Sequence, residues 1–442
     1  MANSKTSFKS HTKSAIFCFL FTACIAFIWL LTTSNSWKDG GINHILKGLG
    51  SFLGLIGYCF FSLSLFLSSR WKKLEDWFGG LDQIYRTHIL MGIWGFSFIL
   101  AHPLILALKW VPNKVDKFLL FLFPLHDRFS VNLGSYSFWL MIVILGITLL
   151  KLFPYDKWKI SHKFMSLVFI LASFHFLTSY KLFGRSELAT ILLLIPMGLG
   201  LSSIIYKQIV YEFLLSYPIY EVVKTKKLNE NTVTATLEPK KGNLAFTPGQ
   251  YAFFSFKKSS LTSESHPFTL LGNASGSNIS IIVKVRGDFT KSLYNELKPK
   301  DLAYVEGPYG KFNYMKAKSS QIWIAGGIGI APFLIWSKEL CNSKNTTKEV
   351  TLFYCVHKKS DAIFLDEFHD ISQKLQNFNF SFFCSEESNR LNAIKVQEKV
   401  GKLKDSTILM CGPKRMTNDL TKQLIDLGIN RKNIIFEDFE FL

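Results

Sequence analysis

The sequence has few acidic residues and no closely paired cysteines, and each shortage excludes a class of chemistry. None of its seven cysteines lies in a short Cys-x-x-Cys pair, so neither a cysteine zinc site nor a dithiol redox centre is indicated. The polar part of the chain is therefore predicted to lie in a reducing cytosol. Acidic residues number 32 against 51 lysines and arginines, which gives a formal net charge of +19.

This positive charge is spread along the whole chain. No long basic block with interleaved aromatic residues occurs, so the pattern argues against nucleic acid as a partner. Anionic membrane lipid and anionic cofactors are the partners that we expect for this charge.

Long apolar runs dominate the first half of the chain. A polar, basic tail of residues 1–14 is followed by six runs long enough to cross a bilayer. They are Ala15–Leu31, Leu46–Ser68, Thr87–Leu108, Leu133–Phe153, His162–Tyr180 and Leu188–Val210. The first run also resembles a signal peptide, but its length and the lack of a small-residue cleavage site favour a membrane helix. The pattern predicts a six-helix membrane domain over residues 15–212.

An even number of spans places both ends of the domain on one side of the membrane. Two loops on that side carry a group of basic residues: Arg70, Lys72, Lys73, Lys151, Lys157 and Lys159. Excess positive charge marks cytoplasmic loops. The opposite side also has cations, Lys109, Lys114, Lys117 and Arg128, which makes the contrast moderate. We expect a multi-pass protein of the cell (inner) membrane, with the N-terminus and the C-terminal half in the cytoplasm.

Four histidines lie inside two of the predicted spans, where ionisable side chains are costly and need a functional reason. His88 and His102 are fourteen residues apart, so both rings face within about 40° of one direction, separated by ~21 Å. His162 and His175 are thirteen apart, so an ideal helix leaves them about 140° apart, and this span must bend, bulge or tilt. Because the two spans run in the same direction, we expect His88 to face His162 and His102 to face His175. Bis-imidazole pairs suit haem iron, while interhelical hydrogen bonding is the alternative.

Beyond the sixth span the pattern changes twice. Residues 213–317 alternate apolar and polar positions in short runs between glycine and proline turns, which predicts an antiparallel β-barrel. In residues 318–442 strands alternate with helices, which predicts an α/β doubly wound parallel sheet.

Two glycine-containing turns follow strands of this last domain. Glycines let the backbone approach a pyrophosphate, and the next helix N-terminus supplies free amides. Each turn alone also has a purely steric explanation, but two turns about 85 residues apart at two strand ends favour a nucleotide site. The candidate residues are Gly326, Gly327, Gly329, Pro332, Cys411, Gly412 and Pro413.

Taken together, these segments resemble the flavocytochromes of the NADPH oxidase and ferric reductase transmembrane superfamily, and most of all its bacterial members. The resemblance covers nearly the whole chain, including both histidine spacings. It implies two non-covalent haem b groups on the four histidines, consistent with the absence of a C-x-x-C-H segment. It also implies a ferredoxin-reductase-like module that binds FAD in the barrel and NAD(P)H in the doubly wound domain.

Two segments resemble the flavin motifs of this family. His266-Pro267-Phe268-Thr269 matches its H-P-F-T motif, which implies that Phe268 and Thr269 contact the flavin ring and His266 its phosphate or ribitol side. Val283–Leu293 resembles the second segment, with Lys284 where the family usually has arginine and Thr290 near the pyrophosphate. In isolation, the first segment is also explained by a strand entry and Lys284 by a solvated charge.

The nucleotide motifs of the family match the two glycine turns and place Cys411 near the position of hydride transfer. Lys358 matches the position at which NADPH users carry a basic residue, so NADPH is expected, with NADH as the alternative. By the same resemblance Phe441, or else Phe439, covers the flavin face, and a packed hydrophobic tail is the alternative.

The resemblance implies electron transfer from cytosolic NAD(P)H through FAD and two haems to an extracytoplasmic acceptor. We expect O2, which would give superoxide; the alternatives are a chelated ferric or cupric ion, or a partner reductase. Animal oxidases carry a histidine where this chain has Leu106, and Lys47 is the one nearby cation for a second basic position. No calcium loop or long insertion is present, so we expect activity without an obligatory protein partner.

Overall fold

The computed structural model describes residues 7–33, 41–111, 113–150, 152–153, 155–179, 187–214, 217–257, 264–272, 278–343, 347–387 and 390–437. The chain divides into two compact units, a helical unit of Ser10–Leu215 and a sheet unit that contains Ser216–Leu442. The change of unit falls close to the end of the predicted membrane domain at residue 212.

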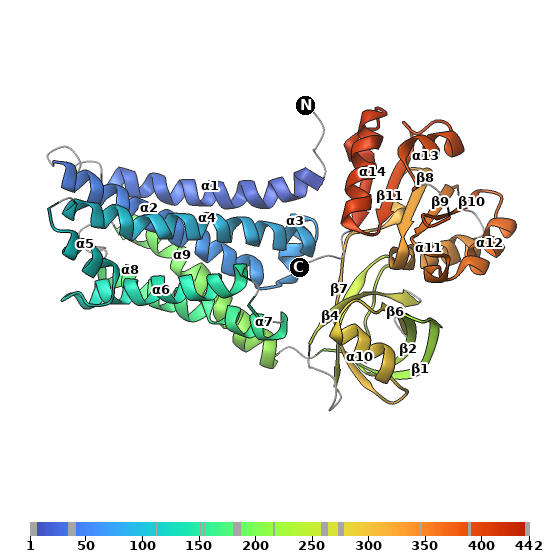
Figure 1. The fold of residues 1–442 in the computed structure, drawn as a ribbon, viewed down its shortest axis with the longest axis horizontal. Helices are drawn as coiled ribbons and strands as arrows, with labels where there is room; N and C mark the ends of the chain where they lie inside the picture. The colour runs from blue at the N-terminus through green and yellow to red at the C-terminus, as the bar shows by residue number, and fades with distance from the viewer. Residues whose placement is uncertain are drawn as a thin grey trace. The chain divides into compact units, whose positions relative to one another are not determined.

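The helical unit contains six helices that are long and apolar enough to cross a membrane. These spans are Lys13–Leu31, Ile42–Ser68, Leu81–Trp110, Phe129–Leu149, Lys157–Ser179 and Thr190–Tyr211. All six predicted spans are confirmed, with ends that differ by a few residues. The long helices run side by side through the unit (Figure 1).

The spans are built from long helices and the ends of the unit from short ones. The long helices are α1 (Ser7–Thr33), α2 (Ile42–Ser68), α4 (Leu81–Ala107), α6 (Phe129–Leu149), α8 (Met165–Ser179) and α9 (Glu187–Ile205). The short elements are α3 (Lys72–Phe78), η2 (Leu108–Trp110), α5 (Val115–Leu122), α7 (Tyr155–Lys163) and η3 (Tyr206–Leu214).

Small residues bring neighbouring helices close together. A Cβ on Gly57 of α2 would lie 2.9 Å from the backbone nitrogen of Ile99, and one on Gly95 of α4 would lie 3.2 Å from that of Phe61. Small residues such as these two glycines allow helix backbones to approach this closely. The Ser62 hydroxyl of α2 then donates to the backbone carbonyl of Pro196 in α9 at 2.5 Å.

The fifth span, predicted over His162–Tyr180 to bend, bulge or tilt, consists of two helices. Helix α7 ends at Lys163 and α8 begins at Met165, with a turn at Phe164. The amide of Phe164 donates to the Ser161 carbonyl at 3.1 Å, which tightens the chain at the junction. This break gives His162 and His175 separate helices, so the angle expected from one ideal helix does not apply.

The first part of the sheet unit is a seven-stranded antiparallel sheet in the order β4-β3-β7-β1-β2-β6-β5. Its strands are β1 (Ile219–Asn229), β2 (Thr232–Lys241), β3 (Tyr251–Lys257), β4 (His266–Thr269), β5 (Leu271–Gly272), β6 (Ile279–Lys284) and β7 (Leu302–Tyr309). Helix α10 (Asp288–Glu296) follows β6 and packs Phe289 and Leu293 on the barrel core. Alternating apolar residues close this core, as the period-two pattern predicts.

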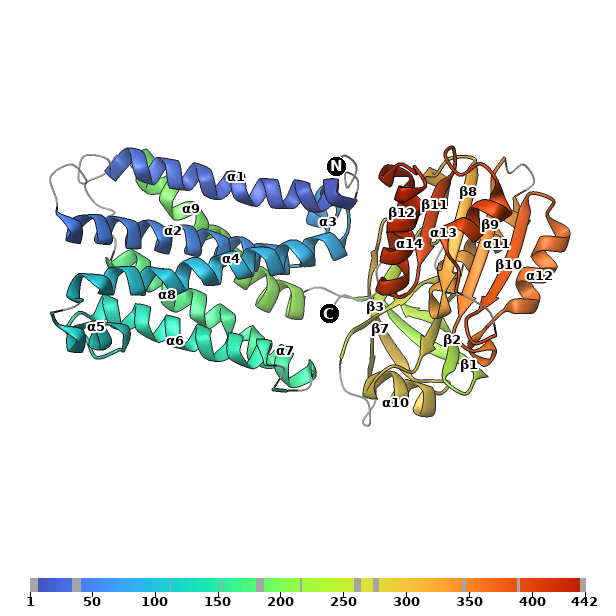
Figure 2. The same ribbon diagram turned by 45° about the horizontal axis from the view of Figure 1, so that its top comes forward.

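The second part is a five-stranded parallel sheet in the order β10-β9-β8-β11-β12, whose strands stand side by side in Figure 2. They are β8 (Ser320–Gly326), β9 (Glu349–Val356), β10 (Phe378–Cys384), β11 (Thr407–Cys411) and β12 (Ile434–Glu437). Helices α11 (Ala331–Asn342) and α12 (Leu365–Lys374) cover the face with Trp323, and α13 (Ala393–Val400) and α14 (Lys414–Asp426) cover the face with Ile324. The doubly wound fold is therefore confirmed.

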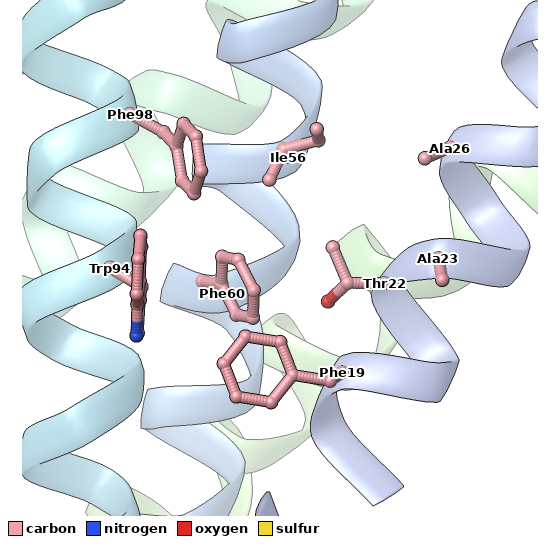
Figure 3. Close-up of a pocket in the computed structure, with 8 residues that line it drawn as sticks. All are labelled: Phe19, Thr22, Ala23, Ala26, Ile56, Phe60, Trp94 and Phe98. Carbon is pink, nitrogen blue, oxygen red and sulfur yellow. The ribbon is translucent and has the colours of Figure 1, made fainter. Parts of the chain in front are cut away.

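An apolar cavity of about 220 Å³ lies between α1, α2 and α4 (Figure 3). It is lined by Phe19, Thr22, Ala23, Ala26, Ile56, Phe60, Trp94 and Phe98. Seven of these eight side chains are apolar, which suits contact with lipid acyl chains.

Candidate functional site

Two pairs of imidazole rings face each other between α4 and the two helices of the fifth span. The ring centroids of His88 and His162 are 6.4 Å apart, with an interplanar angle of 81°. The centroids of His102 and His175 are 6.2 Å apart, with an interplanar angle of 66°. The pairs lie at two levels of α4, with His88 nearer its start and His102 nearer its end.

Three of the four rings bind a backbone carbonyl of a neighbouring helix through Nδ1. The contacts are His88 with Ser64 at 2.8 Å, His102 with Gly50 at 2.7 Å and His175 with Ser130 at 2.7 Å. A carbonyl only accepts, so Nδ1 carries the hydrogen and donates it. In a neutral imidazole this leaves Nε2 with its lone pair free, as a metal ligand requires.

The fourth ring is held differently. Nδ1 of His162 is buried and has no hydrogen-bond partner among the described residues. Its ring instead packs against Trp158, with centroids 5.4 Å apart and an interplanar angle of 31°. The indole Nε1 of Trp158 donates to the Thr148 hydroxyl at 3.0 Å, which anchors this indole on α6.

Two glycines lie directly behind the rings of the second pair. A Cβ on Gly54 of α2 would lie 2.7 Å from Nδ1 of His102, and one on Gly134 of α6 would lie 2.8 Å from Nδ1 of His175. Both glycines therefore provide space that the imidazoles fill. Sequence reasoning missed them, although a glycine within an apolar span is a recognisable sign of close helix packing.

The predicted flavin motif forms β4, beside β3 in the barrel. The side chains of Phe268 and Thr269 are 9% and 8% exposed. Nε2 of His266 donates to the carboxylate of Glu264 at 2.7 Å. The His266 ring stacks on Phe289 of α10 with centroids 4.0 Å apart, so the motif is fixed between strand and helix. Pro267 in the same strand pairs with β3.

Thr290 organises the turn that leads into α10. Its hydroxyl oxygen accepts hydrogen bonds from the amides of Arg286 at 2.8 Å and Gly287 at 3.1 Å. The chain thus enters the helix through a turn closed by the predicted cofactor residue.

Lys284 joins the barrel to the nucleotide domain. Its Nζ lies 3.2 Å from the Asp361 carboxylate, which also accepts a hydrogen bond from Asn231 at 3.1 Å. Burial alone would raise the pKa of Asp361, but the hydrogen bonds from Asn231 and Lys284 and the Lys284 charge outweigh it and lower the pKa below its ordinary value. The pair therefore stays ionised until the pH falls below the usual range of an aspartate.

The first glycine turn connects β8 to α11. The strand ends at Gly326, the 3-10 turn η5 (Gly327–Ile330) follows, and Pro332 occupies the first helical turn. Gly327 has a φ of +55°, a conformation that side chains with a Cβ rarely adopt. The carboxyl end of β8 therefore leads through a tight turn into α11, whose first amide, that of Ala331, donates to the Ile328 carbonyl.

The second turn packs directly against the first. A Cβ on Gly329 would lie 2.9 Å from the Gly412 nitrogen, and one on Gly412 would lie 2.9 Å from the Cα of Gly326. Cys411 is fully buried at the end of β11, and Pro413 follows at the start of α14. The structure thus brings the two predicted turns together at one sheet edge.

Three predicted residues of the nucleotide domain are not part of the two packed glycine turns. Lys358 follows β9 and is exposed, as are His357 and Lys359. Phe439 and Phe441 lie outside the described residues.

Three protein families match consecutive parts of the chain. Residues 53–173 match the ferric reductase like transmembrane component, residues 219–313 the FAD-binding domain and residues 323–422 the oxidoreductase NAD-binding domain. The matches correspond to the helical unit, the antiparallel sheet and the parallel sheet.

Two curated relatives are F subunits of the Na(+)-translocating NADH-quinone reductase. The subunit of Neisseria meningitidis serogroup C is 27% identical over 158 residues, which are 32% of this chain and 38% of the relative. The subunit of Pseudomonas paraeruginosa is 25% identical over 165 residues, which are 35% of this chain and 40% of the relative. The chain thus spans about two fifths of the length of these relatives.

Solved structures resemble parts or all of this chain at low identity. The flavohemoglobin of Malassezia yamatoensis with bound FAD and heme is 15% identical, with a TM-score of 0.51, and the match covers 99% of this chain and 100% of that one. The FAD/NAD-binding domain of a nitric oxide dioxygenase from Vibrio cholerae is 21% identical, with a TM-score of 0.45, covering 50% of this chain and 98% of that one.

The family matches lie in one chain, in the order in which the helical bundle and the two sheets occur. The protein is thus a multi-pass membrane oxidoreductase whose domain architecture matches that of the NADPH oxidase and ferric reductase superfamily.

Proposed function

We propose that this protein carries electrons from cytoplasmic NAD(P)H, by way of FAD and two b-type haems, to an acceptor on the other side of the membrane. The two facing imidazole pairs are the observation that carries the proposal, because they lie at two levels of one membrane helix. A chain that holds its own FAD-binding and NAD-binding domains has no need of a partner reductase.

The spacing of each pair fits one iron between two rings. A metal about 2 Å from an imidazole nitrogen lies roughly 3 Å from the ring centre, so two coordinating rings have centres ~6 Å apart. The distances of 6.4 and 6.2 Å agree with this value. Two imidazoles supply only two ligands, and the described residues include no group of three or more side chains suited to a bare metal ion. A porphyrin, which brings four nitrogens of its own, completes the set.

The surrounding helices would prepare these rings for the haems. The carbonyls of Ser64, Gly50 and Ser130 fix three imidazoles in one tautomer and orientation. For His162, packing by Trp158 would take the place of a carbonyl. Each iron would be held by two histidines of the chain, so the acceptor would be reduced without binding to the metal.

In the sheet unit, β4 and the entry to α10 would hold FAD. The assigned residues are His266, Pro267, Phe268, Thr269, Lys284 and Thr290. When bound, the flavin accepts a hydride and releases electrons singly, and the haems carry single electrons. The stacking of His266 on Phe289 would hold the phosphate-side residue rigid.

The packed glycine turns would hold the dinucleotide. Gly326, Gly327, Gly329 and Pro332 would form the pyrophosphate turn, and Cys411, Gly412 and Pro413 would line the site of hydride transfer. Exposed Lys358 would face the 2′-phosphate of NADPH, and NADH is the alternative. Phe441 or Phe439 would cover the flavin until the nicotinamide displaces it.

For the acceptor we propose O2, reduced by one electron to superoxide, and a chelated ferric or cupric ion as a second candidate. The match of the helical unit to the ferric reductase like transmembrane component favours the second. The NAD(P)H side is proposed to be cytoplasmic, from the basic loops at the end of the bundle where the chain continues into the sheet unit.

The haem assignment is tested by replacing one ligand. His175→Leu is expected to lower the haem content from two to one per chain, because only one ring of that pair remains, while NAD(P)H still reduces the flavin. His44→Leu, which changes an exposed histidine of the same unit, is expected to keep both haems. The pyridine haemochrome assay gives the ratio, and two haems in the His175 variant would contradict the assignment.

The space behind His175 provides a second test. Gly134→Ala is expected to reduce occupancy of that haem site, since its Cβ would lie 2.8 Å from the imidazole. Gly146→Ala on the same helix meets nothing within 4 Å and is expected to leave the haem spectrum unchanged. Reduced-minus-oxidised spectra compare the two variants, and equal spectra would refute a fitted imidazole at this position.

Two substitutions test whether Lys284 binds FAD or only pairs with Asp361. Lys284→Met is expected to weaken FAD binding several-fold, because a cation near the phosphate is lost, whereas Asp361→Asn removes only its partner and is expected to leave FAD bound. Titration of the FAD-depleted protein, followed by flavin fluorescence, measures both. Equal weakening in the two variants would assign Lys284 to the domain contact alone.

The proposal that O2 is the acceptor is tested in air with purified protein and NADPH. Cytochrome c reduction is expected to be abolished by superoxide dismutase, since the electrons would travel as superoxide. Persistent reduction in the presence of the enzyme would exclude O2 as the intermediate carrier.

A further inference from the structure

The turn between β1 and β2 of the barrel contacts a loop of the nucleotide domain. In that turn, Nδ2 of Asn229 donates to the Ser360 carbonyl at 3.0 Å. Nδ2 of Asn231 donates to the Asp361 carboxylate at 3.1 Å. Both acceptors lie in the loop that follows β9. Two amide side chains of one domain thus hold two successive residues of the other.

Apolar packing supports this contact. Leu228 near the end of β1 and Ile282 of β6 belong to the same cluster of packed apolar side chains as Ala362 and Ile363, which directly follow the loop. Ile282 and Ile363 are both buried, so water is excluded where the two domains meet. Hydrogen bonds beside such a surface are stronger than hydrogen bonds in open solvent.

Helix α10 fixes the turn from its other side. The hydroxyl of Tyr294 donates to the Asn229 carbonyl at 3.0 Å, and Nζ of Lys227 lies 4.3 Å from the centroid of the Tyr294 ring. This is the helix whose entry, at Thr290, is assigned to FAD. The turn is therefore a firm support for the loop, connected to the proposed flavin site.

Lys358 lies between two anchored points of this loop. Before it, the His357 carbonyl accepts a hydrogen bond from the Glu386 amide at 3.0 Å. After it, the Asp361 amide donates to the Lys358 carbonyl at 3.0 Å, which closes a turn from residue 358 to residue 361. The backbone of Lys358 is thus fixed, while its side chain is exposed.

The contact also determines which cation the carboxylate of the loop meets. Asp361 is the one acidic residue of the stretch 357–361, and its carboxylate lies 3.2 Å from Nζ of Lys284 in the barrel. Both side chains are only 22% exposed, so solvent screens this pair less than an open surface pair. Within the described part of the chain, neither Lys358 nor Lys359 forms an ion pair. The two lysines therefore remain available to an anionic ligand.

We propose that Asn231 and Asp361 are positioning residues that set the preference for NADPH over NADH, because they hold the loop from which Lys358 meets the 2′-phosphate. The inference rests on the proposed function, in which Lys358 faces that phosphate, and it makes the barrel a determinant of nucleotide choice. A loop fixed before binding loses less conformational freedom when the ligand arrives, which increases affinity. NADH lacks the 2′-phosphate, so its binding does not depend on this contact.

The experiment first reverses and then restores one hydrogen bond. Asn231→Asp places a second carboxylate against Asp361, and the repulsion releases the loop. The double variant N231D/D361N again has one amide and one carboxylate, with their places exchanged. In N231D we expect the affinity for NADPH to fall about fivefold while the affinity for NADH is unchanged. In N231D/D361N we expect the affinity for NADPH to return to within about twofold of the wild type.

Both affinities are measured with the full-length protein and added FAD, without oxygen. The rate of flavin reduction at increasing NADPH or NADH gives a Kd and a limiting rate for each nucleotide. The limiting rates are expected to stay unchanged, because the loop is assigned to the phosphate of the ribose and not to the nicotinamide. Calorimetric titration with 2′,5′-ADP and 5′-ADP, which differ only in the 2′-phosphate, measures the same preference without electron transfer.

The matched control is Glu230→Gln, which changes the exposed residue between the two asparagines of the same turn and is expected to keep the wild-type preference. Lys358→Met is expected to lose the preference with the contact intact. The inference alone would be overturned if N231D keeps the preference, weakens both nucleotides equally, or is not restored by D361N, or if E230Q loses as much as N231D. An unchanged preference in K358M would overturn the assignment of Lys358 as well.

Discussion

The helical unit depends on hydrogen bonds from imidazole nitrogens to backbone carbonyls within an apolar bundle. A polar nitrogen left without a partner in such surroundings costs free energy, which favours a hydrogen bond at the inner edge of each ring. Carbonyls of α2 and α6 satisfy one edge of His88, His102 and His175. The other edge is left for a ligand. The same contacts that hold the bundle together thus orient the groups that would bind the haems.

In the sheet unit, close packing of two backbone turns plays a comparable part. Two turns far apart in the sequence approach until a single added methyl group would collide, which makes Gly329 and Gly412 necessary at the edge of the parallel sheet. This close approach places both turns at one edge of the parallel sheet. In both units, glycine provides the space and the neighbouring backbone provides the polar atoms.

Much of this arrangement could be predicted from the sequence, because it depends on patterns that are local. Long apolar runs identify the spans, and strand ends identify the glycine turns. The histidine spacing indicated that the fifth span must bend, bulge or tilt, but the position of the break at Phe164 could not be predicted, since neither proline nor glycine marks it. The sequence also does not indicate which carbonyls bind the histidines, because every residue has a backbone carbonyl. The pairing of Lys284 with Asp361 joins segments from two domains, and only the folded chain reveals it.

The interrupted fifth span has a wider consequence. With α7 and α8 as separate segments, the position of His162 is not tied by helical geometry to that of His175. The one-residue turn at Phe164 thus sets the direction of each ring separately within one span. A single apolar span can therefore carry two imidazoles with different orientations, because one residue between its helices changes the direction of the chain.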